Sequence, residues 1–151
     1  MKSILTWTLF LFVLTLVSCN FSEILPKKMD GSAGNSTYYI DNQTGKDLSM
    51  TFPISVYTQE KGMHEMDSSI ALHRNTRLRF YEDQGHFGLN PHPEMALTSI
   101  RFYTHENNQQ KLVYEMAPVK TVNWTKHIVS RDKDGIGATD YIFILTPSHL
   151  K

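Results

Sequence analysis

Cysteine is almost absent from this sequence, since Cys19 is the single cysteine among 151 residues. One cysteine cannot form a disulfide within the chain or supply a cysteine cluster for a metal ion. An excess of charge of one sign is also lacking, with 15 basic and 15 acidic side chains. Because nucleic-acid binding needs a basic surface, we expect no nucleic-acid partner. The fold must be held together by its apolar core.

A hydrophobic run long enough to cross a membrane is missing too. The longest apolar run, residues 4–17, has 14 residues, whereas a membrane-spanning helix needs about 20. The run follows Lys2, as in the apolar core of a secretory signal peptide. It ends in Leu16-Val17-Ser18-Cys19, which resembles the lipobox of bacterial lipoproteins. That resemblance implies cleavage after Ser18 and lipid attachment to Cys19, and the alternative is an ordinary signal peptide with an incidental cysteine.

These features divide the chain into four predicted segments. The stretch Asp30–Ser36 is rich in glycine, serine and asparagine, a composition typical of flexible linkers. A single domain is the natural count for the remaining length. We therefore expect a lipoprotein signal peptide at 1–18, a lipidated cysteine and flexible tether at 19–36, a folded domain at 37–147 and a C-terminal tail at 148–151.

The folded segment carries a period-two pattern. Apolar side chains alternate with others from Leu48 to Val56, as in a strand with one buried face. Pro53 lies inside this run and cannot donate a ladder hydrogen bond, which favours an edge position or a bend. The only candidate for a short helix is Val119–Ser130, and the other predicted strands are 37–42, 69–73, 76–82, 97–104, 111–115 and 139–146. We predict an all-β fold, a single antiparallel β-sandwich of the immunoglobulin or transthyretin type.

Motifs for catalysis are lacking. Gly-x-Ser-x-Gly and the zinc-binding spacings His-x-His and His-Glu-x-x-His do not occur. We therefore expect no enzymatic activity, no cofactor and no metal ion. His86 and His92 share a loop rich in glycine and proline, residues 85–93. A small metal-dependent hydrolase that uses these loop histidines is the alternative function.

Two groups of residues are candidates for binding. The first is the Gly/Pro loop with His86, Phe87 and His92, because rigid sandwiches commonly bind through their loops. The second contains tyrosines that fall on the polar face of predicted strands, namely Tyr57, Tyr81 and Tyr103. Exposed tyrosines can stack on sugars or anchor protein interfaces. They are also ordinary strand formers, so the pattern alone does not separate the two interpretations.

The layout resembles that of small uncharacterised lipoproteins of the Bacteroidetes. The features that carry the resemblance are the lipobox at Cys19, the polar tether, Tyr39–Gly45, the Gly/Pro loop before Leu97–Tyr103, Asn123-Trp124 and Asp140–Thr146. The resemblance implies a β-sandwich held to a membrane by lipid and carries no activity. In lipoproteins of that phylum an acidic run after the cysteine is associated with export to the cell surface, and in enterobacteria an aspartate directly after it is associated with the inner membrane. Here Asn20 follows the cysteine and Glu23 is the one acid in residues 20–24, so the resemblance implies the outer membrane, facing the periplasm. The expected partner is an unknown protein or glycan of the cell envelope.

Overall fold

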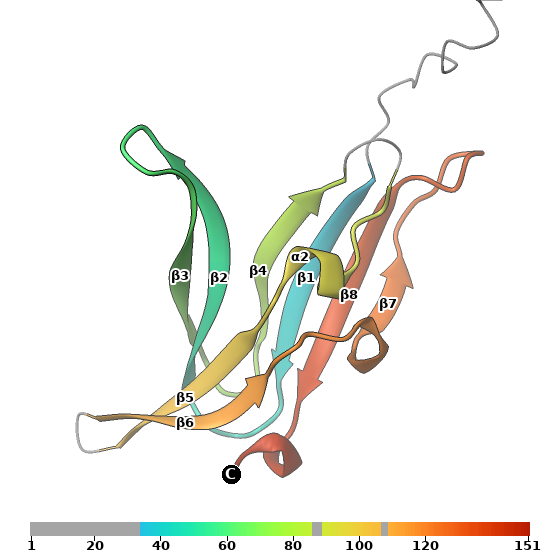
Figure 1. The fold of residues 1–151 in the computed structure, drawn as a ribbon. Helices are drawn as coiled ribbons and strands as arrows, with labels where there is room; N and C mark the ends of the chain where they lie inside the picture. The colour runs from blue at the N-terminus through green and yellow to red at the C-terminus, as the bar shows by residue number, and fades with distance from the viewer. Residues whose placement is uncertain (1–33, 86–88, 107–108) are drawn as a thin grey trace, which may run out of the picture. The chain divides into compact units, whose positions relative to one another are not determined.

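Two four-stranded β-sheets packed face to face form the domain (Figure 1). The computed structural model describes residues 34–85, 89–106 and 109–151, with the side chain of Tyr57 excepted. The strands in these residues are β1 (Asn35–Asn42), β2 (Leu48–Thr58), β3 (Gly62–Leu72), β4 (Arg77–Gln84), β5 (Ile100–Glu106), β6 (Gln109–Met116), β7 (Thr125–Ile128) and β8 (Ala138–Leu145). Short helical turns are α2 (Pro93–Ala96), η1 (Thr121–Asn123) and η2 (Pro147–His149). The predicted β-sandwich is confirmed.

The strand order is β4-β1-β8-β7 in the first sheet and β3-β2-β5-β6 in the second. Neighbouring strands run antiparallel with one exception in the described residues, the parallel pair of β1 and β8. The prediction of purely antiparallel pairing therefore misses this pair. Parallel strands need a long connection, and here the whole remainder of the sandwich lies between β1 and β8 along the chain.

The core lies between the sheets and is built by alternation along the strands. In β1, Tyr38 and Ile40 are fully buried, and in β8, Tyr141, Phe143 and Leu145 are buried. The parallel register sets Tyr38 beside Tyr141, and their rings stack at 5.7 Å. β8 is a central strand of its sheet, since it lies between β1 and β7.

The candidate helix at Val119–Ser130 is a wrong prediction. This segment holds the single 3-10 turn η1 and then strand β7, which pairs with β8. The reason is that Trp124 is buried while its neighbours on both sides are exposed. Such a segment buries one side chain at a time and has no continuous apolar stripe to hold a helix against the core.

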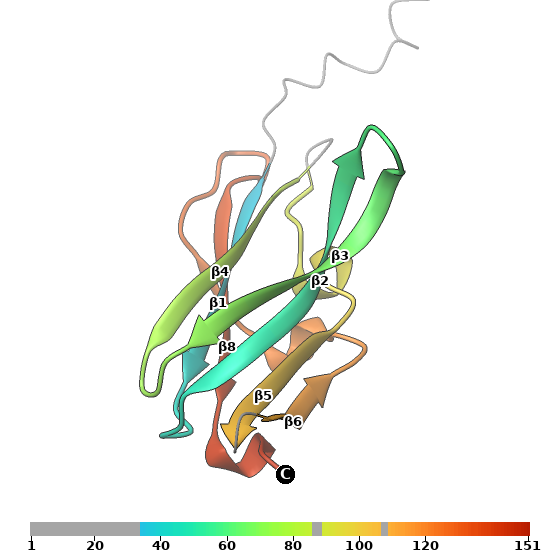
Figure 2. The same ribbon diagram turned by 90° about the vertical axis from the view of Figure 1, so that its left-hand side faces the viewer.

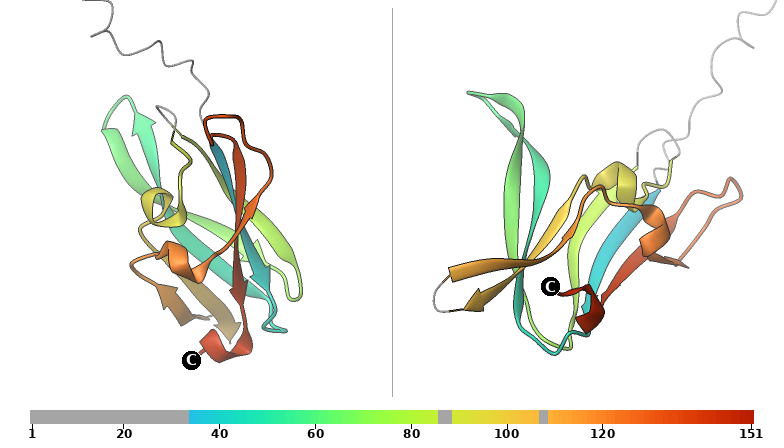
Figure 3. Two further views of the ribbon diagram at one scale, coloured as in Figure 1. Left: turned by 90° about the vertical axis from the view of Figure 1, so that its right-hand side faces the viewer. Right: turned by 60° about the horizontal axis from the view of Figure 1, so that its bottom comes forward.

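The C-terminal residues 148–151, predicted as a tail, pack on the domain. Leu150 lies against the core, and the backbone N–H of Lys151 donates to the carbonyl of Val113 in β6 at 2.9 Å. Figure 3 shows the C-terminal turn beside the second sheet. The chain end therefore helps to close the sandwich.

Candidate functional site

The predicted binding loop is described only in part. His86 and Phe87 lie outside the described residues. His92 is half-buried just before α2, where its Nδ1 lies 3.2 Å from the Thr121 hydroxyl and 3.8 Å from the Glu94 carboxylate. This histidine links α2 to η1.

The neighbouring residues of the same loop are hydrogen-bonded to residues at the edge of the first sheet. The Ser36 hydroxyl donates to the carbonyl of Pro91 at 2.5 Å. The Asn90 amide donates to the carbonyl of Gly135 at 3.0 Å and accepts from the N–H of Gly137 at 3.2 Å. Asn90 and Pro91 therefore pack against the ends of β1 and β8 instead of projecting into solvent.

The position predicted for Tyr81, on the polar face of its strand, is wrong. Its ring lies 5.9 Å from the buried ring of Tyr38, on the core side of the sheet. The cause is a β-bulge in β4: Tyr38 pairs with Tyr81 but Tyr39 pairs with Arg79, so Phe80 is an extra residue. Both Phe80 and Tyr81 therefore touch the core, since a bulge interrupts the alternation of faces.

The other predicted tyrosines do not join Tyr81. Tyr103 is half-buried on the outer face of the second sheet, between Ser49 of β2 and Leu112 of β6. The side chain of Tyr57 lies outside what the structure describes. The three tyrosines therefore do not form one exposed surface, because Tyr81 lies on the core side of its sheet.

Within the described residues, no three His, Cys, Asp or Glu side chains come together as ligands for a metal ion. His92 and Glu94 approach each other but lack a third ligand there. His64, on β3, faces the carbonyl of Gly62 at 3.2 Å. Of the two loop histidines in the hydrolase alternative, His92 is described and His86 lies outside the described residues.

The most distinctive feature of the described surface is the hairpin of β2 and β3. Both strands have 11 residues, but only Ser49–Thr51 of β2 pair with β5. The rest of the hairpin, residues 52–68, extends beyond β5 and β6 as a two-stranded ribbon, which we call the arm (Figure 2). A two-stranded ribbon is marginally stable by itself in water.

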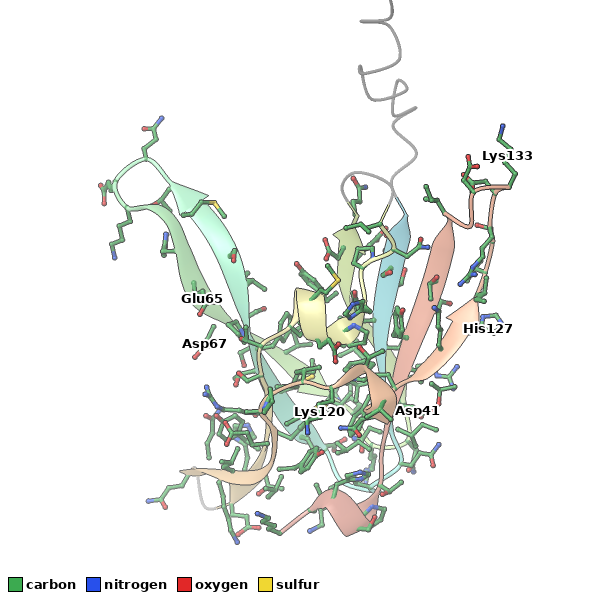
Figure 4. The ribbon with its side chains drawn as sticks, turned by 45° about the vertical axis from the view of Figure 1, so that its right-hand side comes forward. Asp41, Glu65, Asp67, Lys120, His127 and Lys133 are labelled. Carbon is green, nitrogen blue, oxygen red and sulfur yellow. The ribbon has the colours of Figure 1, made fainter. Side chains whose placement is uncertain are left out.

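The arm has an open backbone edge along β3. β3 is the last strand of its sheet, so its outer edge has no strand beside it in the described part of the chain. Side chains that face outward next to this edge include Glu65 and Asp67, which lie on the side of the arm turned away from the first sheet (Figure 4). Neither carboxylate has an ion-pair partner within 4.0 Å among the described residues.

Exposed methionines flank the same edge on both faces. Met63 pairs with Tyr57 and Met66 pairs with Ile54, so the two methionines lie on opposite faces of the arm. Their exposed fractions are 68% and 50%. Methionine side chains are flexible and adapt their shape to neighbouring groups, and here both are exposed to solvent.

A second concave region lies at the C-terminal end of the domain. Two open hollows of about 450 and 320 Å³ share Tyr114 and His149 in their walls. The remaining walls are Leu112, Val113, Glu115, Ser148 and Lys151 in the larger hollow and Asn123, Thr125, Phe143 and Ile144 in the smaller. Burial raises the pKa of the Tyr114 hydroxyl above its ordinary value.

Sequence reasoning missed both regions. Because the outer face of β3 is polar, the sequence does not predict a strand in its first half. No residue pattern indicates that a hairpin extends beyond its sheet. For the C-terminal hollows one signal exists: Thr146-Pro147-Ser148-His149 has the spacing of a helix capping box, with histidine at the position of the usual glutamate or glutamine. That spacing predicts an ordered turn where we expected a tail.

No family model, curated protein or solved structure matches this chain. No helix in the described residues is long and apolar enough to cross a membrane.

Proposed function

We propose that this chain is a lipid-anchored, non-catalytic binding module of the bacterial cell envelope, which captures an extended segment of an envelope protein on the open edge of β3. The observation that carries the proposal is the arm, a two-stranded ribbon that extends beyond its sheet with an unpaired edge. The lipobox at Cys19 supports the anchor, on the outer membrane facing the periplasm.

Strand addition fits this edge better than a flat side-chain contact. An added strand forms main-chain hydrogen bonds with the open edge, and its side chains alternate between the two faces of the sheet. Met63 and Met66 are exposed on opposite faces of β3, so each face has an apolar contact for the added strand. The third strand also supports the ribbon, since three strands are more stable than two.

The charge of the edge selects a basic segment over a second copy of this chain. Opposite charges on neighbouring strands stabilise a sheet, whereas like charges destabilise it. Glu65 and Asp67 lie on one face of β3 with no ion pair in the described residues. Two β3 strands placed side by side bring acid near acid, which discourages self-pairing. A segment with lysine or arginine at alternate positions satisfies both carboxylates.

The anchor is tested by the location of the full chain in a bacterial host. We expect wild-type protein to sediment with membranes and to incorporate a fatty-acid analogue, and we expect Cys19→Ser to abolish both. Two acyl chains hold a protein on a membrane far more firmly than one. Ser22→Ala is the matched control and should remain in the membrane fraction. An unlabelled wild-type protein that is cleaved at another bond would contradict the lipid anchor.

The arm is tested with defined peptides, so that no unknown partner is needed. The probes are two peptides of about ten residues, one that alternates threonine with lysine and one that alternates threonine with glutamate. We expect the lysine peptide to bind and the amides of β3 to gain protection from hydrogen exchange. We expect Glu65→Lys with Asp67→Lys to weaken this binding about tenfold, since each cross-strand charge pair contributes up to about 1 kcal/mol.

The same double variant should gain affinity for the glutamate peptide, which separates charge recognition from loss of folding. The matched control carries Glu106→Lys and Asp134→Lys, two exposed acids outside the arm, and should bind like wild type. Equal affinity of both peptides for wild type would contradict the proposal, as would protection that appears on another strand.

A further inference from the structure

The chain enters the folded domain at one end of the first sheet, and the end of β7 lies beside that point. The backbone N–H of Asn35 donates to the carbonyl of Gly137 at 3.0 Å, and Asn35 is paired with Ala138 in β8. On the other side of β8, the backbone N–H of Val129 donates to the carbonyl of Ala138 at 2.9 Å. Figure 1 shows the start of β1 and the end of β7 at the same end of the first sheet. One strand therefore separates Val129 from the point of entry.

Exposed aliphatic side chains surround this point of entry. The exposed fractions are 48% for Ile128, 55% for Val129 and 56% for Leu89. Leu89 lies against Gly34, where an added Cβ would come within 2.9 Å of the Leu89 carbonyl oxygen. The adjacent Asn90 side chain is hydrogen-bonded to the loop after β7. Single exposed apolar side chains are ordinary on a protein surface, so it is their grouping at this end that needs an explanation.

The loop that follows β7 adds two long cationic side chains. Arg131 and Lys133 are exposed, and neither forms an ion pair within 4.0 Å in the described residues. Figure 4 shows Lys133 at the tip of this loop, pointing away from the sheet. The loop also contains Asp132, whose carboxylate accepts from the backbone N–H groups of Asp134 and Ile136 at 2.9 Å each, and the Asp134 side chain is exposed. Because these charges balance, any attraction at this end comes mainly from the apolar side chains.

We propose that this end of the domain, through Leu89, Ile128 and Val129, lies against the surface of the lipid bilayer that holds the chain. The inference rests on the lipid anchor in the proposed function. Fully extended, residues 19–33 span at most about 50 Å, so an anchor at Cys19 keeps the bilayer within reach of the point of entry. A contact too weak to hold a free protein is populated in this situation, because it forms within one tethered molecule.

A lipid surface fits these side chains better than a protein partner does. Protein interfaces are enriched in aromatic residues and methionine, whereas this group is aliphatic. Arginine and lysine keep their apolar stems against an apolar surface while their charged ends stay at the headgroups and water, a position open to Arg131 and Lys133. The surface belongs to the first sheet and the arm to the second, so the two proposals concern different residues.

The test places a fluorophore on the loop after β7 in the full, lipidated chain. Because Cys19 carries the anchor, Asp134→Cys provides a free thiol at an exposed position for a nitrobenzoxadiazole label. The chain is reconstituted in vesicles of phosphatidylethanolamine and phosphatidylglycerol that include lipids with a nitroxide on the acyl chain. We expect the nitroxide lipids to quench this label. The same label at Gln110→Cys, an exposed position in the second sheet, should not be quenched.

Two valines provide a matched pair of variants in the labelled chain. Val129→Glu and Val122→Glu make the same change at exposed positions after and before β7. We expect Val129→Glu to shift the equilibrium away from the bilayer contact about tenfold, since a charge replaces an apolar side chain that the contact buries. Val122→Glu should leave the quenching unchanged. Both variants should sediment with the vesicles, because neither change touches the anchor.

The outcomes separate this inference from the anchor. A labelled chain that sediments with the vesicles but is not quenched overturns the bilayer contact alone, whereas a chain that does not sediment contradicts the anchor as well. Equal quenching in the Val129→Glu and Val122→Glu variants also overturns the contact. A blue shift of the label without quenching overturns it too, since another protein molecule would then cover this end of the domain.

Discussion

Replacing Tyr38 by alanine should lower the free energy of unfolding by about 4 kcal/mol, as for other large aromatic residues removed from a core. Tyr38 is 0% exposed, and its ring lies 5.7 Å from Tyr141, 5.9 Å from Tyr81 and 6.1 Å from Trp124. The side chain therefore joins three strands of the first sheet and the segment before β7. Alanine leaves a cavity that these rigid rings cannot fill.

The neighbouring residue provides the control for this change. Tyr39 is the same residue type on the same strand but lies on the opposite, half-exposed face. We expect Tyr39→Ala to cost less than about 1 kcal/mol. Equilibrium unfolding in urea measures both variants. Similar losses for Tyr38 and Tyr39 would contradict the assignment of the core face.

Asn42→Ala should lower the free energy of unfolding by about 3 kcal/mol, because it leaves several buried polar groups without partners. The Asn42 amide donates to the carbonyls of Lys46 at 2.9 Å and His73 at 3.0 Å. Its carbonyl oxygen accepts from the backbone N–H of Thr44 at 3.1 Å and from the Thr44 hydroxyl at 2.7 Å. One fully buried side chain thereby ties the turn after β1 to the turn before β4.

Two further variants separate hydrogen bonding from packing at Asn42. Asn42→Asp has the same shape but replaces the donor by an oxygen that faces two carbonyl oxygens, so it should destabilise at least as much as alanine. Gln43→Ala, at the adjacent exposed position, should stay within about 0.5 kcal/mol of wild type. Thermal and urea unfolding of the four proteins test this ranking. A stable Asn42→Asp protein would show that the amide donor is dispensable.

The turns and the central strands are the parts of the fold that local sequence predicts well. The chain turns between β1 and β2 at Asn42-Gln43-Thr44-Gly45-Lys46, where Gly45 adopts a φ of 74°, a conformation that glycine reaches without strain. The alternation from Leu48 is confirmed as β2, whose inner residues Met50 and Phe52 are buried. These features need no partner in space, since a turn or an alternating pattern is complete within a few residues.

The candidate binding residues could be predicted only as far as alternation holds. Tyr103 lies outward, as period two requires, because the extra residue at the register shift beside it, Val113, belongs to β6 and not to its own strand. Tyr81 follows an extra residue opposite β1, so its face depends on how two distant strands pair. For His149 the capping spacing was visible, but its contacts with Tyr114 and Phe143 depend on the return of the chain end to β6.

The sequence by itself determined an all-β domain, because alternating apolar residues must bury one face and the turn residues between them end each strand. Only the tertiary structure decided three things: the parallel pairing of β1 with β8, the inward turn of Tyr81 and the extension of β2 and β3 beyond their sheet. Each depends on which strands become neighbours. Strand pairing is a relation between segments far apart in the chain, so no window of consecutive residues contains it.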